Sequence, residues 1–296
     1  MPTAPPPPAV RPKRAADAPS PLRPPLPQPG AALRWRNLLG SSRGLAIAAA
    51  ARQHPGPVLV ITADVRTAQQ IEDEIGFYDA EIGVWPFPDW ESLPYDAFSP
   101  HPDIISRRLD TLRRLPTLAH GVVVVALPTL LHRLTPPTHI GAHAFTLQVG
   151  NELDLNAFRQ QLAAASYQHV AQVMAPGEFA LRGGLLDLFP MGASTPYRID
   201  LFDDRIDSIR LFDTETQRSG AKLDAVELLP AREYPFSPEA IQKFRHAFRA
   251  RFEGDPQSVA LYRDVTQGLN PAGIEYYLPL FFEQMATLFD YVPANA

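Results

Sequence analysis

The residues that most resemble a chemical site form a short glycine loop ahead of an alanine-rich helical segment: Gly40, Ser41, Ser42, Arg43 and Gly44. In a phosphate-binding loop, backbone N–H groups hold phosphate oxygens, a Lys neutralises their charge and a Ser or Thr hydroxyl binds Mg²⁺. Leu45 and Ala46 stand where that Lys and that hydroxyl are needed. We therefore interpret the loop as a turn kept for its backbone shape and expect no ATP or magnesium site in this chain. The alternative is a helicase-like ATPase that uses Arg43 for phosphate contact.

A second candidate is a metal site at two histidines. His139 and His143 have the spacing of two ligands on one helix face, but no Glu lies between them and Gly141 weakens a helix. The sequence has no Cys, which excludes thiolate ligands, thiol nucleophiles and disulfides and fits a reducing cytoplasm. No carboxylate pair or Ser/His/Asp arrangement stands out. We expect neither a metal site nor a catalytic residue.

The third candidate is a strand with an unusual polar face. Alternation along residues 197–202 separates one apolar face from a second face that carries Arg198, Asp200 and Phe202. A Phe exposed beside an Arg is typical of protein-interface hot spots. Arg182 ends another short strand and could join this surface. The alternative is that Phe202 packs under a loop or helix while Arg198 pairs with Asp200.

The elements that would position these residues begin with an alternation of strands and helices between Leu33 and His143. Short apolar runs predict strands over Val58–Ile61, Val84–Pro86 and Val122–Leu127. Helical periodicity predicts helices over Val65–Tyr78 and Asp103–Leu115. This order indicates a parallel α/β sheet.

Residues 144–230 have a different pattern. A helix is expected over Asn156–Ala165, after Asp154 as a cap, and four short strands follow over Phe179–Arg182, Leu185–Phe189, Tyr197–Phe202 and Ile206–Phe212. These elements predict a small antiparallel α+β module. Beyond Pro230 the pattern becomes helical again, with Phe244, Phe248 and Phe252 at helical spacing. The apolar end of the sequence lacks a stop signal, so we expect the chain to end inside a domain.

Composition and charge limit the kinds of partner that this chain can bind. The 296 residues are 45% hydrophobic, and no apolar run approaches the ~20 residues that span a bilayer. Residues 1–30 form a Pro/Ala-rich tail of charge +3, which we expect to be disordered; the total of −5 leaves −8 on residues 31–296. An acidic body does not favour duplex DNA as a partner. Four arginines in the second predicted helix are interpreted as a solvated face, with weak DNA binding as the alternative: Arg107, Arg108, Arg113 and Arg114.

Three segments of the sequence resemble a known family: Asp89–Pro116, Phe179–Ser219 and Pro271–Phe282. They are similar to the UvrB-like N-terminal region of bacterial transcription-repair coupling factors, the Mfd family, and the similarity extends in order over about residues 33–296. The resemblance implies a RecA-like parallel-sheet domain 1a (31–143) with a degenerate P-loop. A small α+β domain 2 (144–230) would interrupt it, as in UvrB, before the start of domain 1b (231–296).

The resemblance also implies a function. Members of the family are ATP-driven translocases that remove stalled RNA polymerase from DNA damage and recruit the excision machinery, and domain 2 binds UvrA. The family residues that engage UvrA match Arg182, Arg198 and Phe202. RNA polymerase, duplex DNA, ATP and magnesium would be used by parts of the full-length protein that are absent from this chain.

Two departures separate the chain from UvrB itself. The loop lacks the P-loop Lys, and the space between Tyr95 and Leu109 is too short for UvrB's aromatic DNA hairpin. We therefore expect a non-catalytic, cytoplasmic scaffold that recruits UvrA to stalled polymerase for nucleotide excision repair. The alternative is a UvrB-like ATP- and DNA-binding repair subunit with an unorthodox nucleotide site.

Overall fold

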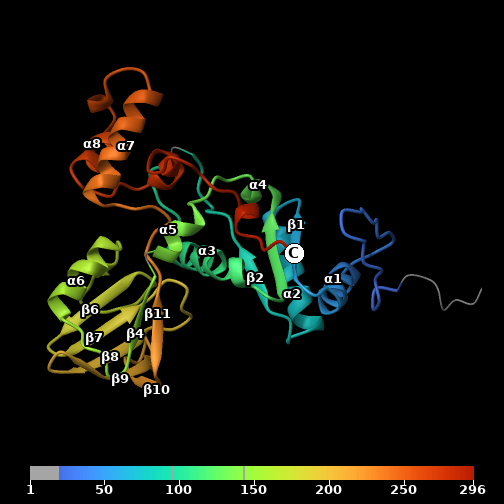
Figure 1. The fold of residues 1–296 in the computed structure, drawn as a ribbon, viewed down its shortest axis with the longest axis horizontal. Helices are drawn as coiled ribbons and strands as arrows, with labels where there is room; N and C mark the ends of the chain where they lie inside the picture. The colour runs from blue at the N-terminus through green and yellow to red at the C-terminus, as the bar shows by residue number, and fades with distance from the viewer. Residues whose placement is uncertain (1–19, 95, 143) are drawn as a thin grey trace, which may run out of the picture.

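The computed structural model describes residues 20–94, 96–142 and 144–296, and it has three adjoining parts (Figure 1). A parallel-sheet body holds most of the first half of the chain, an antiparallel-sheet module follows, and a mainly helical segment ends the chain. The expected disorder of the tail falls largely on residues 1–19, outside the described residues, and stays a prediction. In the described remainder of the tail, the Trp35 indole N–H donates to the Pro25 carbonyl (3.0 Å).

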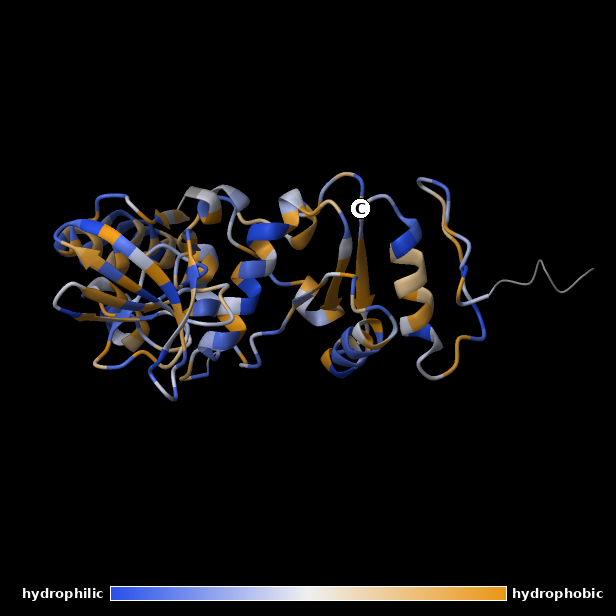
Figure 2. Ribbon diagram, turned by 90° about the horizontal axis from the view of Figure 1, so that it is seen from below, coloured by the Kyte–Doolittle hydropathy of each residue, from blue (hydrophilic) through white to orange (hydrophobic). Residues whose placement is uncertain are grey.

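The first part is built on a three-stranded parallel sheet in the order β1-β3-β2. Its strands are β1 (Pro57–Thr62), β2 (Val84–Phe87) and β3 (Gly121–Ala126). All six residues of the central β3 are buried, because helices cover both faces of the sheet. This burial explains why the strand is a continuous apolar run, which is also visible in Figure 2.

Alternate residues of β3 contact different helices. Val122 and Val124 share a core with α1 (Ser42–Gln53) and α2 (Val65–Tyr78). Val123 and Val125 belong to the main core, to which α3 (Pro102–Arg114) contributes its apolar side. Because successive side chains of a strand point to opposite faces, β3 contributes to the cores on both sides of the sheet. Short helical segments complete it: η2 (Leu115–Thr117), α4 (Leu127–Leu130) and α5 (Pro137–Ala142).

The second part is a six-stranded sheet in the order β10-β9-β8-β7-β6-β5, antiparallel except for β5–β6. Its strands are β5 (Gln168–His169), β6 (Glu178–Arg182), β7 (Leu185–Phe189), β8 (Tyr197–Phe202), β9 (Arg205–Phe212) and β10 (Ser219–Leu223). Helix α6 (Leu155–Ala164) packs on its inner face through Phe158 and Leu162. The Asp154 carboxylate caps α6, accepting from the Asn156 and Ala157 N–H groups.

A separate strand pair connects the beginning and the end of this module. Strands β4 (Phe145–Gln148) and β11 (Ala225–Leu228) run antiparallel, so the chain enters and leaves at one place. An excursion of this kind from the body is what an inserted domain requires.

The third part is helical and aromatic. It contains α7 (Pro238–Arg251), η3 (Pro256–Ser258), α8 (Ala260–Thr266), η4 (Ile274–Leu280) and η5 (Leu288–Asp290). Phe244, Phe248, Tyr262 and Phe281 form its centre. The chain then returns to the body, where Ala286 pairs with Leu134 and the final residues lie beside β1 (Figure 1).

The expected fold class is confirmed. Every strand and helix predicted up to residue 212 is present within one or two residues of its predicted ends. Within the described ranges, no helix is both long and apolar enough to cross a bilayer.

Candidate protein-interaction site

The strand register places Arg182, Arg198 and Phe202 on one face of the antiparallel sheet. Arg182 of β6 lies opposite Leu185 of β7, and Leu185 lies opposite Asp200 of β8. Arg198, Asp200 and Phe202 alternate along β8, so all three predicted residues are on the face opposite α6. The sequence predicted this grouping for two residues of the same strand, and the register adds the third.

Phe202 is a large apolar side chain that water reaches. It is 76% exposed at the end of β8, opposite Arg205 and next to the turn at Asp203 and Asp204. The alternative expectation, that Phe202 packs under a loop or helix, is wrong. A Phe side chain held on a rigid strand and left in water is available to fill a pocket on another protein.

Hydrogen bonds within the antiparallel-sheet module hold the Arg198 side chain in a fixed position. Its Nε and Nη2 donate to the two carboxylate oxygens of Asp187 on β7 (2.7 and 2.8 Å), and Nη1 donates to the Gln217 carbonyl (3.1 Å). The guanidinium carbon also lies 4.9 Å from the centre of the Phe212 ring. The hydrogen bonds to Asp187 are the main cause of the raised pKa of Arg198. A bidentate pair of this kind fixes both the position and the plane of the guanidinium group.

The expected pairing of Arg198 with Asp200 is wrong. Asp187 lies directly opposite Arg198 across the β7–β8 ladder, whereas Asp200 is two residues further along the same strand. Residues directly opposite are about 5 Å apart, closer than residues i and i+2 of one strand. Asp200 instead accepts from the Ser208 hydroxyl on β9 (2.9 Å).

Arg182 is exposed at the other side of this face. Its Nη2 donates to the Ala171 carbonyl (2.7 Å), in the segment that leads into β6. The remaining guanidinium N–H groups have no hydrogen-bond partner among the residues that the structure describes, so they can bond to a carboxylate of another molecule. Figure 1 shows this sheet at the far end of the molecule from α1, away from the parallel-sheet body.

The surroundings of the glycine loop differ from those of a nucleotide-binding site, because side chains of α2 contact it. Glu74 of α2 accepts a hydrogen bond from the Gly44 N–H in the first turn of α1 (3.1 Å), and the Ser41 hydroxyl contacts the Tyr78 hydroxyl (2.7 Å). A helix N-terminus attracts anions, and here the protein's own carboxylate occupies that position. A phosphate would meet a negative charge at the place where a P-loop offers N–H groups.

All four arginines of α3 form ion pairs with carboxylates of the same chain. Three form ion pairs near the surface: Arg107 with Glu72 (3.7 Å), Arg113 with Glu227 (2.6 Å) and Arg114 with Asp110 (2.5 Å). Arg108 is completely buried and pairs with Glu233. The expectation of a solvated face is therefore wrong for Arg108, and the intramolecular pairing of the other three does not favour DNA binding.

The structure does not test a metal site at the two histidines, because only His139 lies among the residues that it describes. The His139 ring lies in α5, edge-on to Phe282 with centroids 5.2 Å apart, and His143 is outside the described residues. No group of three or more potential ligands is found among the described residues. The expectation that no metal binds stays a prediction.

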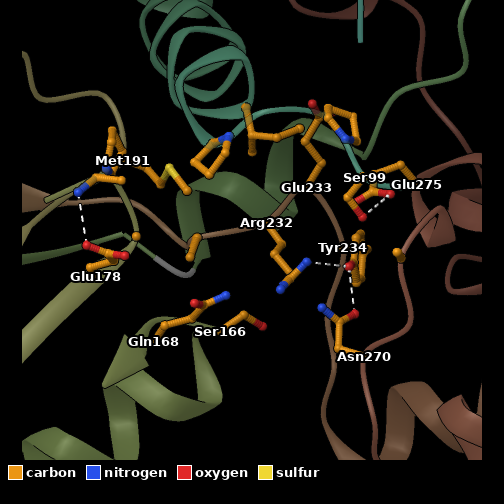
Figure 3. A pocket seen from close by; sticks show the side chains of 18 residues that line it. Ser99, Ser166, Gln168, Glu178, Met191, Arg232, Glu233, Tyr234, Asn270 and Glu275 are labelled. Carbon is orange, nitrogen blue, oxygen red and sulfur yellow. Dashed lines mark hydrogen bonds between the residues drawn. The ribbon is translucent and has the colours of Figure 1, made fainter. Parts of the chain in front are cut away.

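A cavity of about 340 Å³ lies where the three parts of the chain meet (Figure 3). Several of its polar side chains bond to one another: Arg232 donates to the Tyr234 hydroxyl (2.9 Å), which lies 2.8 Å from the Asn270 amide, and Ser99 donates to Glu275 (2.9 Å). Burial raises the pKa of the Glu275 carboxyl group. Sequence reasoning did not find these residues, because they come from distant segments without a motif. The internal hydrogen bonds indicate a junction between parts of the chain.

Comparison with known proteins identifies the module. Residues 145–234 match the UvrB interaction domain family. The chain is 47% identical over 265 residues to the transcription-repair-coupling factor of Escherichia coli, a match that covers 88% of this chain and 23% of the relative. The corresponding proteins of Haemophilus influenzae and Bacillus subtilis are 43% and 30% identical, each over 87% of this chain.

The fold and these matches define the class: a parallel-sheet α/β body followed by an antiparallel-sheet module that matches the UvrB interaction domain. Over most of its length the chain is homologous to the transcription-repair coupling factor, Mfd. It spans about a quarter of the length of the relatives it matches. The expected similarity to this family is confirmed.

Proposed function

We propose that this chain is a non-catalytic scaffold of transcription-coupled nucleotide excision repair that binds UvrA through the outer face of its antiparallel sheet. The observation that carries the proposal is the grouping of Arg182, Arg198 and Phe202 on one face of a UvrB interaction domain. In the longer proteins to which it is similar, this contact would bring UvrA to an RNA polymerase stalled on damaged duplex DNA in the cytoplasm.

The geometry of the face supports tight binding at low entropic cost. Phe202 lies on a regular strand, and Arg198 is fixed by Asp187 before any partner arrives. A side chain that is already ordered loses less conformational freedom on association. Phe202 would fill an apolar pocket, while Arg182 would pair with a carboxylate of the partner.

The alternative, an ATP- and DNA-binding subunit like UvrB, has less support. Leu45 replaces the Lys of a P-loop, and Glu74 occupies the anion-binding position of α1. The arginines of α3 form ion pairs within the chain, which does not favour contact with DNA. In this proposal the chain itself therefore uses neither ATP nor magnesium.

The experiment is a titration of the chain with purified UvrA, comparing Phe202→Ala with the wild type. Truncation of an anchor residue costs ~2 kcal/mol or more, so we expect affinity to fall by about 30-fold or more. Phe77→Ala is a matched control, since Phe77 is similarly exposed (84% against 76% for Phe202) but lies on α2 of the parallel-sheet body. Wild-type affinity of a folded Phe202→Ala variant would refute the proposed site.

A further inference from the structure

Three cations lie in one row across the outer face of the antiparallel sheet. Arg198 of β8 is directly opposite Arg210 of β9, and Arg210 is directly opposite Lys222 of β10. Directly opposite residues of antiparallel strands project from the same face, so the row continues from the proposed binding residue Arg198 toward the sheet edge. Strands are about 4.8 Å apart, so the row extends over roughly 10 Å.

Two of the three charges have no carboxylate partner in the described part of the chain. Asp187 neutralises Arg198, but the closest hydrogen-bond partner of Arg210 is the Ser208 hydroxyl, at 3.5 Å. Lys222 is exposed, and neither Lys222 nor Arg210 has an ion pair among the residues that the structure describes.

This arrangement is unfavourable for the isolated module. Like charges directly opposite one another destabilise a sheet. The chain as a whole is acidic, with a formal charge of −5, so two neighbouring cations without an ion pair depart from its average surface. An anionic partner would relieve the repulsion, whereas the folded chain alone does not.

We propose that Arg210 and Lys222 extend the binding face beyond Arg198 and dock a strip of carboxylates on the protein partner. This inference rests on the proposed function and adds an electrostatic region to its site. Phe202 and Arg198 are four residues apart on β8, about 13 Å. The extended face therefore combines an apolar anchor at one end of β8 with a cationic row at the other.

A protein surface fits this face better than a nucleic acid does. Three exposed carboxylates surround the β8–β9 turn beside Phe202: Asp203, Asp204 and Asp207. They would repel a phosphate backbone that followed the sheet past the cationic row. A protein can instead place carboxylates only where the row needs them and an apolar pocket at Phe202.

The test is the charge-reversed double variant Arg210→Glu/Lys222→Glu, titrated with UvrA at low and at physiological salt. Charges outside the buried anchor act mainly on association rate and salt dependence. We expect the association rate constant to fall by roughly tenfold at low salt and the salt dependence of binding to become weaker. A matched control is Lys243→Glu/Arg251→Glu, which reverses two exposed cations on α7.

The neutral variant Arg210→Gln/Lys222→Gln separates binding from folding. Because it removes a repulsion, it should melt at the same temperature as the wild type or higher, while it binds UvrA more slowly. A variant that loses binding only because it unfolds would contradict the inference.

Phe202→Ala in the same series distinguishes the two proposals. If Phe202→Ala abolishes binding but charge reversal changes neither rate nor salt dependence, the inference about Arg210 and Lys222 is wrong and the proposed function stands. If Phe202→Ala binds normally, the proposed function fails at its centre. If charge reversal leaves UvrA binding intact but removes salt-dependent binding of duplex DNA, the row is a nucleic-acid contact and the inference is overturned.

Discussion

Arg108 and Glu233, 125 residues apart in the chain, form an ion pair that solvent does not reach. The Arg108 Nε donates to Glu233 Oε1 (2.5 Å) and Nη2 to Oε2 (3.3 Å), and the two side chains are 0% and 2% exposed. The guanidinium also packs on the rings of Phe87 and Trp90. Because Glu233 lies where the chain leaves the antiparallel module, this pair attaches the end of the module to α3 of the body.

Removing one partner of this pair should destabilise the protein strongly. Arg108→Met leaves the Glu233 carboxylate buried without its counter-charge, which costs about 3–5 kcal/mol of unfolding free energy. Denaturant unfolding measures the change. Arg107→Met on the same helix is the control and should cost less than about 1 kcal/mol, because its pair with Glu72 lies at the surface. Equal effects for the two variants would contradict the buried pair.

Glu275 should make stability depend on pH. Burial raises the pKa of its carboxyl group in the folded state, so folding favours the protonated form. Its contribution to stability is full below the unfolded pKa and is lost as pH rises through the folded pKa. Glu275→Gln should therefore raise the melting temperature at pH 7.5 by roughly 2–4 °C.

The pH profile supplies the decisive comparison for Glu275. The difference in melting temperature between Glu275→Gln and the wild type should shrink as pH falls through the raised pKa of the wild-type carboxyl group, which then becomes protonated. Glu283→Gln, at an exposed position in the same part of the chain, is the control for the effect of the substitution itself. A constant difference at all pH values would disprove the assignment.

Asp187 should act on binding through Arg198. In Asp187→Ala the guanidinium loses its bidentate acceptor and becomes free to move, so we expect UvrA affinity to fall by about tenfold. A double-mutant cycle with Arg198→Ala measures this: once Arg198 is absent, removing Asp187 should weaken binding little further. Asp79→Ala is the control, because Asp79 accepts a similar bidentate pair of hydrogen bonds from Arg52 but lies at the end of α2, away from the binding face. Additive losses in the cycle would show that Asp187 acts independently of Arg198.

Two glycine substitutions should change the stability of the fold in opposite directions. A Cβ at Gly44 would overlap the Glu74 side chain, so Gly44→Ala should destabilise the protein by about 1–3 kcal/mol. Gly76 lies in α2 with open space around it, and Gly76→Ala should stabilise by about 0.5–1 kcal/mol through helix propensity. Thermal melts of the two variants compare the signs. Glu74→Ala should leave most of the Gly44→Ala penalty, because the atom that the new Cβ meets first is the Glu74 Cβ, which alanine retains, whereas Glu74→Gly should remove it.

Much of the fold follows from local patterns. The run Val122–Val125 reads as a strand buried on both faces, and the structure places it between two layers of helices. Asp154 caps α6 as expected, since its carboxylate reaches the first N–H groups of the helix next to it in sequence. By contrast, strands β4 and β11 were not predicted. Each is four residues long, and their pairing depends on a partner about 80 residues away.

The sequence by itself determined the order of the elements, the alternating face of β8 and the similarity to transcription-repair coupling factors. These depend on periodicity, caps and residue identity, which act over a few neighbours. Only the tertiary structure decided which arginine of α3 is buried, that Arg198 pairs with Asp187 rather than Asp200, and that Glu74 occupies the start of α1. Each of these depends on strand register or on a side chain from a distant segment, because charge pairing follows distance in space and not distance along the chain.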